Sequence, residues 1–240
     1  FILKIAKQGF EINFNDFDEN GKAMLLMLHY DVWQSAGGFD SLEKSIKAIN
    51  NNKVLVKEII EVLELLIDKV DFKEIDIQLP YNQPLKLHAR YTRDQILAAF
   101  GLSTFDRKSP SREGVAENVD LNTELLFINL IKSEENFSPT TMYDDYAISE
   151  TMFHWQSQNS SRPDIGRGLS YIKHQENDKK ILLFIREKAN DEKGNTMGYV
   201  FIGEGNFKEN EGEKPMNIKW ELSEPMPNYL WKDSAKMSIG

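Results

Sequence analysis

The run KILLFIRE at 180–187 decides the fold of the C-terminal part, because it is a short, nearly continuous apolar segment bounded by turn residues. Turn-rich stretches such as NDKK, NDEKGN and NEGEKP separate it from its neighbours. Short strands at this spacing predict a mostly antiparallel curved sheet or a barrel. The companion runs are TELLFINLI at 123–131, MGYVFIGE at 197–204 and MNIKWELS at 216–223.

The first third of the chain has helical periodicity instead. AMLLMLHYDVW at 23–33 and SLEKSIKAI at 41–49 carry apolar residues near a 3.6-residue period, and Gly37-Gly38 ends the first segment. VLVKEIIEVLELLIDKV at 54–70 is the strongest helix, with a wide apolar face. The fold class is therefore α+β. We expect a helical connector subdomain over 1–85 and a β-rich domain over 86–240.

Pro80 and Pro84 mark the expected boundary between these domains. Before it, DFKEIDIQL at 71–79 alternates in part and suggests a strand. After it, Thr92 with Gln95 forms a capping box that opens the short helix DQILAAF. No clear second helix follows, so the pattern of a DNA-binding helix-turn-helix is incomplete.

Composition narrows the class of protein without naming a function. The 240 residues are 40% hydrophobic and 28% charged, which is typical of a soluble globular protein. No apolar run approaches the roughly 20 residues of a membrane span, and we expect no signal peptide. The chain has no cysteine, which excludes disulfides and cysteine-ligated metals. We expect a cytoplasmic protein with no membrane partner, and the initial Phe1 suggests a piece of a longer chain.

The net charge of −9 lowers the expectation of DNA binding, since phosphate neutralisation supplies much of the affinity of DNA-binding proteins. A local basic face, or a partner domain, could still supply the electrostatics. The candidate phosphate-binding residues lie near the loops around 109–114 and 158–168, although ordinary surface charge explains them equally well. They are Arg93, Arg107, Lys108, Arg112, Arg162 and Arg167.

The segment SPTTMYDDYAISETMFHWQSQ at 138–158 is the best candidate for a binding site, because it mixes flat rings with hydrogen-bonding side chains. The alternative is a half-buried strand pair whose polar residues face water. In a regular strand, Phe153, Trp155 and Ser157 would share one face, opposite His154 and Gln156. We favour the Trp155 face. The candidate base-binding residues are Tyr143, Asp144, Asp145, Tyr146, Phe153, Trp155, Gln156 and Ser157.

Familiar catalytic motifs are missing. The sequence has no G-x-x-x-x-G-K-[ST], no H-E-x-x-H and no G-x-S-x-G. Asp164, Asp178 and Lys180 imitate the acidic-plus-lysine pattern of metal-dependent nucleases, but Asp178 and Lys180 fall in a turn. We therefore expect no catalytic residue, no metal site and no cofactor in this chain.

Several runs together resemble one bacterial family. LHARYTRDQILAAFG at 87–101, FSPTTMYDDYAIS at 137–149, FHWQSQ at 153–158 and EGEKPMNIKWELSEPMP at 211–227 are its motifs, and the match covers roughly 87–227. The chain is similar to the C-terminal domain that follows a phospholipase-D-type nuclease and a superfamily-2 helicase in bacterial proteins. That domain resembles the target-recognition region of SauUSI-type type IV restriction enzymes.

The resemblance implies a reader of 5-methylcytosine or 5-hydroxymethylcytosine in duplex DNA, with an SRA-like or PUA-like barrel. It implies base flipping into an aromatic pocket, which costs a few kcal/mol that stacking and hydrogen bonds offset. The implied partners are double-stranded DNA and the helicase and nuclease domains of the same polypeptide, which would use ATP and Mg²⁺. Two alternatives stay open: a structural or protein-interaction domain that regulates the helicase–nuclease core, and a nuclease that uses Asp164, Asp178 and Lys180.

Overall fold

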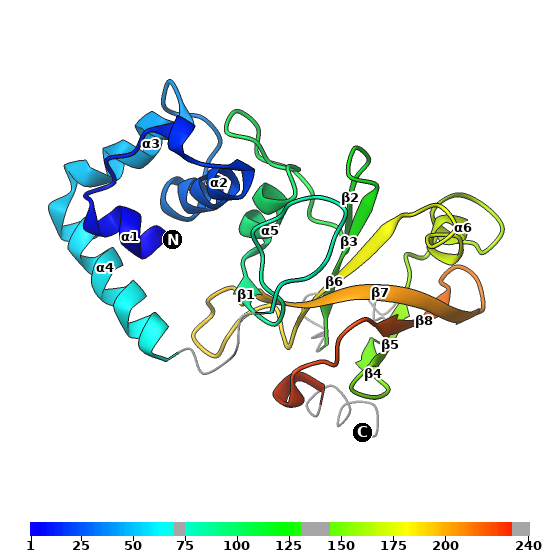
Figure 1. The fold of residues 1–240 in the computed structure, drawn as a ribbon. Helices are drawn as coiled ribbons and strands as arrows, with labels where there is room; N and C mark the ends of the chain where they lie inside the picture. Colours follow the sequence, from blue (N-terminus) through cyan, green and yellow to red (C-terminus); the bar gives the residue numbers. More distant parts are fainter. Residues whose placement is uncertain (70–74, 131–144, 232–240) are drawn as a thin grey trace. The chain divides into compact units, whose positions relative to one another are not determined.

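The structure is a computed structural model of the chain, and it describes residues 1–69, 75–130 and 145–231. The chain divides into two compact units, shown in Figure 1. Unit 1 contains Phe1–Lys86 and Thr92–Pro110, and unit 2 contains Leu87–Tyr91 and Ser111–Gly240. The first division falls one residue from the boundary expected at 85. The segment 92–110, which we expected in the β-rich domain, packs with the helices instead.

Unit 1 is helical, as the sequence predicts, and α2, α3 and α5 each begin at a capping side chain. Asp18 and Ser41 accept hydrogen bonds from the first turns of their helices, and Thr92 with Gln95 forms the complete capping box. The elements are α1 (Ile2–Lys7), η1 (Phe14–Asp16), α2 (Glu19–Trp33), α3 (Leu42–Ala48), η2 (Ile49–Asn51), α4 (Lys53–Asp68) and α5 (Arg93–Ala99).

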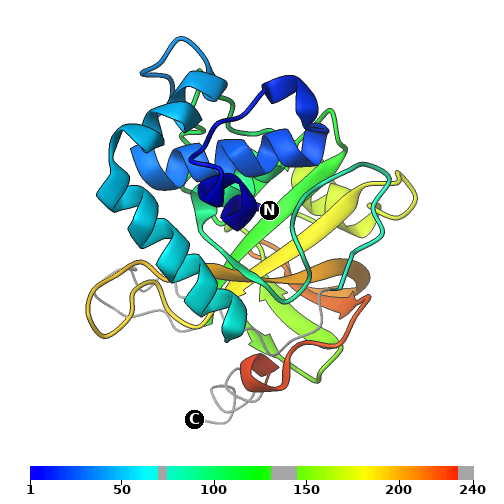
Figure 2. The same cartoon turned by 60° about the vertical axis from the view of Figure 1, so that its left-hand side comes forward.

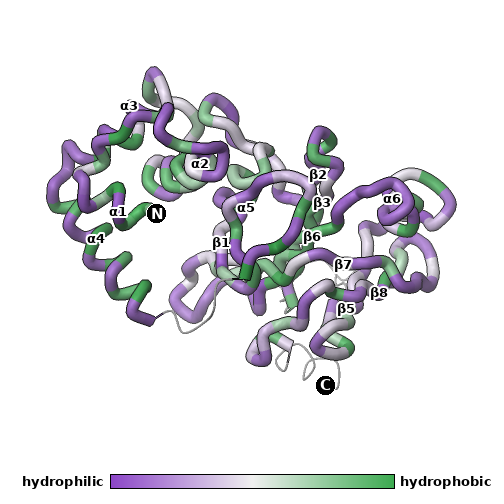
Figure 3. The backbone as a smooth tube through the Cα atoms, in the orientation of Figure 1, coloured by the Kyte–Doolittle hydropathy of each residue, from purple (hydrophilic) through white to green (hydrophobic). Residues whose placement is uncertain are grey.

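The core of unit 1 lies among α1, α2, α3 and the first half of α4. Phe10, Leu25 and Ile46 are fully buried there, and Val56 of α4 packs against them. Figure 3 shows hydrophobic and hydrophilic residues alternating along α4. The strand expected at 71–79 does not form over 75–79, the part of it that the structure describes. No helix in the described residues is long and apolar enough to cross a membrane.

Unit 2 is an open curved sheet, visible in Figures 1 and 2. Its strand order is β2-β3-β6-β7-β8-β5-β4, with β1 pairing on β7, and only the β3–β6 pair is parallel. In the described residues the sheet ends at β2 and β4, so the barrel alternative is not realised. The elements are β1 (Arg90–Tyr91), β2 (Val115–Asn118), β3 (Thr123–Asn129), β4 (Tyr146–Ala147), β5 (Met152–Gln156), α6 (Gly166–Ile172), β6 (Lys180–Arg186), β7 (Tyr199–Glu211) and β8 (Asn217–Leu222).

The helix α6, which lacks a capping side chain and was not expected from the sequence, is fixed by its packing. A Cβ at Gly168 would lie 2.1 Å from the carbonyl oxygen of Arg162 and 2.6 Å from the sulfur of Met216, so only glycine allows this approach. Tyr171 is fully buried from the same helix and joins the core of the sheet. Tertiary contacts therefore hold α6 in place.

Candidate functional site

The described part of the segment expected to bind a base begins at Asp145 and contains the paired strands β4 and β5. Tyr143 and Asp144 lie outside the described residues. The other candidates are placed on two opposite faces, because successive side chains of a strand alternate. This alternation was expected, and it separates the candidate residues into two groups with different surroundings.

Phe153, Trp155 and Ser157 face the core. Trp155 is 5% exposed and meets the ring of Tyr171 edge-on, with ring centroids 5.3 Å apart. The Ser157 hydroxyl accepts a hydrogen bond of 2.9 Å from the backbone N–H of Met216. The face that we favoured for the base is therefore packed within the protein in this structure, which gives these residues a structural role.

Tyr146, His154 and Gln156 share the opposite face of β4 and β5; we refer to them as the Tyr146 face. Asp145 immediately precedes β4 and is 9% exposed. The rings of Tyr146 and His154 stack, with centroids 4.6 Å apart and planes 15° from parallel. The Asp145 carboxylate accepts a 2.8 Å bond from the backbone N–H of Gln156, and the Gln156 amide donates to Asn217. The segment therefore has a partly exposed ring on this face, and the residue before it in the sequence has a largely buried carboxylate that is bonded to β5.

The residues expected to bind phosphate are divided between the units. Lys108 pairs with Asp94 at 2.7 Å in unit 1. In unit 2 Arg162 makes two hydrogen bonds to Asp164, at 3.0 and 2.9 Å. Such pairing reduces the positive charge available to DNA. The remaining candidates are Arg167, which contacts the buried Glu124 at 3.2 Å, Arg93 at the start of α5, and the exposed Arg107 and Arg112.

The residues of the nuclease alternative are engaged with other partners. Asp164 is paired with Arg162, and the Lys180 amine lies 2.9 Å from Glu204. Asp178 occupies a turn with a φ of +52°, before β6 begins. Across the described residues no group of three or more His, Cys, Asp or Glu side chains is arranged to hold a metal ion.

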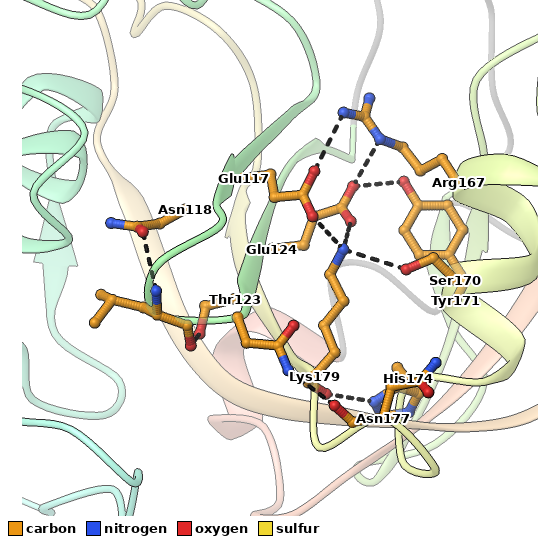
Figure 4. A network of polar contacts seen from close by, with 12 residues as sticks. Glu117, Asn118, Thr123, Glu124, Arg167, Ser170, Tyr171, His174, Asn177 and Lys179 are labelled. Atoms are coloured by element: carbon orange, nitrogen blue, oxygen red, sulfur yellow. Dashed lines mark hydrogen bonds and ion pairs between the residues drawn. The ribbon is translucent and has the colours of Figure 1, made fainter.

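Sequence reasoning missed a partly buried ionic network, centred on the buried Glu124 and Lys179, that Figure 4 shows between β2, β3, α6 and the start of β6. Glu117 and Glu124 are directly opposite on β2 and β3, which would be unfavourable for two like charges alone. The Lys179 amine bridges them at 2.6 and 3.0 Å, and the Tyr171 hydroxyl donates to Glu124 at 2.9 Å. Arg167 contacts Glu124 from the other side, so two anions face two cations.

The electrostatics of this network follow from its burial. Burial, and then the nearby Glu124 charge, raises the pKa of the Tyr171 hydroxyl well above its usual range, so that it stays a donor. For Lys179, burial alone would lower the pKa of the amine, but the bonds to Glu117 and Glu124 outweigh it and the pKa is raised. Both groups are thereby held in the protonated forms that the two carboxylates require.

Comparison with protein families gives one match. The family model described as a domain of unknown function, DUF3427, matches residues 85–234. The chain belongs to the DUF3427 family. The match covers the region in which the sequence motifs were found, and it includes β1, α5 and all of the sheet. No curated protein matches the chain significantly.

Two solved structures are weakly similar to this DUF3427 protein. The Arabidopsis thaliana SUVH6 in complex with SAM has a TM-score of 0.40 at 10% identity and 94% coverage of this chain. The 5-hydroxymethylcytosine-specific restriction enzyme AbaSI has a TM-score of 0.35 at 15% identity and 81% coverage. The chain spans 40% and 59% of those two chains. These scores are too low to carry an argument about fold or function.

Proposed function

We propose that unit 2 is a recognition module for duplex DNA that contains 5-methylcytosine or 5-hydroxymethylcytosine. The observation that carries the proposal is the Tyr146 face, where a partly exposed ring stacks on His154, while the carboxylate of the preceding residue, Asp145, is bonded to the backbone of β5. The motifs that resemble SauUSI-type restriction enzymes support it, since Asp145 and Tyr146 lie in the most distinctive of them. The SRA-like or PUA-like assignment stays a prediction.

The chemistry of the Tyr146 face suits an extruded cytosine. A base that leaves the duplex loses its stacking, and an aromatic ring such as Tyr146 replaces part of it. A carboxylate accepts hydrogen bonds and does not donate them, so Asp145 complements the exocyclic amine of cytosine. The bond from the Gln156 N–H fixes the orientation of this carboxylate and leaves less freedom to lose on binding.

In this proposal the chain recognises its target and cuts nothing. We assign it no catalytic residue, metal or cofactor. Cleavage and ATP hydrolysis would belong to nuclease and helicase domains elsewhere in the same polypeptide, with ATP and Mg²⁺ as their cofactors. The module would thus direct a type IV restriction endonuclease to modified DNA.

Equilibrium binding of the 240-residue chain to three matched duplexes tests the proposal. The duplexes are identical except that one cytosine is unmodified, methylated or hydroxymethylated. We expect tighter binding to at least one modified duplex. Equal affinity for all three would refute the proposed function, and Mg²⁺-dependent cleavage by the chain alone would favour the nuclease alternative.

Two variants locate the site on the Tyr146 face. Tyr146→Ala should lower the preference for modified DNA by about tenfold to a hundredfold, because stacking contributes about 1–3 kcal/mol per base. Asp145→Asn keeps the shape but adds a donor towards the cytosine amine, and it should also weaken the preference. Tyr229→Ala is the matched control, since Tyr229 is a half-exposed tyrosine of the same unit that interacts with Arg90.

One observation favours a second function for unit 1. The last turns of α4 expose large apolar side chains: Val62, Leu65, Leu66 and Ile67 are each at least 50% exposed. Exposed apolar patches often mark protein contacts. We propose that unit 1 docks on another protein domain, which would agree with its expected role as a connector. Leu65→Glu should disrupt that contact in the full-length protein without affecting the affinity of unit 2 for DNA.

A further inference from the structure

Arg186 is held rigidly at the end of β6. Its Nε donates to Asn129 Oδ1, at the end of the neighbouring strand β3, over 2.6 Å. Its Nη1 donates to the carbonyl oxygens of Met197 and Ala189, at 3.0 and 3.3 Å. The guanidinium also lies over the ring of Tyr199, 4.4 Å from its centroid. Four contacts, one from each of four residues, therefore fix its plane.

Among the described residues, no acid matches the charge of Arg186. Every one of its hydrogen bonds goes to a neutral oxygen, and no carboxylate among the described residues lies within 4.0 Å of its nitrogens. The contrast with Arg90 is direct, because Arg90 makes two bonds to Glu187, at 2.9 and 2.7 Å. Burial lowers the pKa of Arg186, yet a guanidinium stays charged at neutral pH.

A partly buried charge without a counterion is costly unless a partner supplies one. Arginine has five N–H donors, and the described protein atoms accept from Nε and Nη1 only. The two N–H groups of Nη2 have no acceptor within the described part of the chain, and the Arg186 side chain is only partly buried, so an outside oxygen can accept from them. Their fixed geometry suits an oxyanion, since arginine binds phosphate with both charge and direction.

We propose that Arg186 is a phosphate-binding residue whose Nη2 donates to a non-bridging oxygen of a phosphate group. The source we favour is the DNA backbone, and this choice rests on the proposed function of unit 2. A phosphate contact positions the protein on the duplex and carries no sequence information. Arg186 therefore contributes to the affinity for DNA and leaves the preference for modified cytosine unchanged.

The test compares Arg186→Gln with Arg90→Gln in the 240-residue chain. Arg90 is an arginine of the same unit whose charge is already paired with Glu187. For Arg186→Gln we expect about tenfold weaker binding to modified and unmodified duplexes alike, and a salt slope smaller by about 1. For Arg90→Gln we expect both quantities to stay close to those of the parent chain.

A second measurement does not depend on the variant folding well. The Nε–H resonance of Arg186 is followed by NMR in the parent chain while a duplex, inorganic phosphate or a nucleoside monophosphate is added. Arg186→Lys assigns the resonance. A shift with the duplex supports the backbone as the source. A shift with the small phosphates alone, with duplex binding unchanged in Arg186→Gln, supports the phosphate site but assigns it to a free phosphate compound.

The inference is overturned if none of the three probes moves the Arg186 resonance and Arg186→Gln leaves the salt slope unchanged. Arg186 would then serve only to hold β3 and β6 together. This failure is separate from that of the proposed function. The phosphate site alone is refuted if the parent chain prefers modified DNA, Arg186→Gln has no effect on binding and no probe moves the Arg186 resonance. Equal affinity for all three duplexes refutes the modified-cytosine function alone.

Discussion

Charged side chains have opposite surroundings at the two ends of the parallel strand pair β3–β6. Where the strands begin, Glu124 is fully buried and is matched by Lys179 and Arg167. Where they end, Arg186 lies beside Asn129 and above Tyr199 with no acid within 4.0 Å among the described residues. The same two strands thus carry a closed ionic network at one end and an unmatched cation at the other.

This difference separates a structural use of charge from a binding use. A buried pair holds its elements together, and removing one partner leaves the other charged and desolvated. Arg186 has no such acidic partner among the described residues, so its loss leaves no desolvated charge behind and costs less stability. The comparison therefore predicts large stability effects at the start of the strands and mainly binding effects at their end.

Lys179→Met should give the largest loss of stability. It leaves Glu117 and Glu124 opposite one another without the cation that bridges them, and breaking a buried pair costs about 3–5 kcal/mol. The free energy of unfolding in urea measures the effect. Lys173→Met is the control, because Lys173 pairs with Glu176 at the exposed surface, where such a pair is worth about 0–1 kcal/mol. Similar losses in the two variants would contradict the assignment of the network.

Trp155→Ala tests whether the core-facing side of β5 stabilises the fold, as the ionic network does. Its ring packs against Tyr171, which donates to Glu124 in the network. Truncating a buried tryptophan costs about 3–5 kcal/mol. Thermal melting and the ratio of affinities for modified and unmodified DNA distinguish the roles. A variant that melts normally but loses the preference for modified DNA would show that Trp155 binds the base.

Local signals in the sequence were sufficient for most elements but not for the site. Asp18, Ser41 and the pair Thr92–Gln95 cap their helices through residues three positions away, so the sequence identifies these starts. The short apolar runs of the sequence identify the strands β3, β6, β7 and β8. The alternation along β5 was also visible, which separated Trp155 from His154.

The sequence did not reveal which face of β5 points into the core, because this depends on residues that are distant in the sequence. Trp155 faces inward where Trp220 of β8 and Tyr171 of α6 complete the core. Glu124 and Lys179 are 55 positions apart in the sequence and meet only because β3 and β6 pair in parallel. The sequence alone does not reveal that these strands pair, so Glu124 and Lys179 resemble ordinary charged residues of the surface.

His174, which lies beside the ionic network, should make the stability of the protein depend on pH. Its Nδ1 lies 3.0 Å from the carbonyl oxygen of Lys179, and its Nε2 accepts from the backbone N–H of Phe207. Burial lowers the pKa of His174, although the bond to Lys179 and the Glu204 charge oppose this. The folded state thus favours neutral His174, whose stabilisation is complete above about pH 6.5 and is lost as the pH falls towards the lowered pKa.

The measurement is the free energy of unfolding of the parent chain and of His174→Gln across this pH range. The difference between the two should change by up to about 1.4 kcal/mol per pH unit, since at most one proton is involved. Other groups titrate in both proteins and cancel in the difference. A difference that is constant with pH would show that His174 does not titrate in this way.

Arg186→Gln should have the smallest effect on stability, about 1 kcal/mol. The substitution removes the bonds to Asn129 and to two carbonyl groups, but the glutamine amide can replace one of them, and no buried carboxylate is left without a partner. Urea unfolding beside Lys179→Met gives the comparison directly. If Arg186→Gln destabilises the protein as much as Lys179→Met does, the arginine is chiefly a structural tie between β3 and β6, and the contrast between the two strand ends fails. A small loss of stability together with a reduced salt slope on DNA would instead confirm that a cation left unmatched by the protein is matched by its ligand.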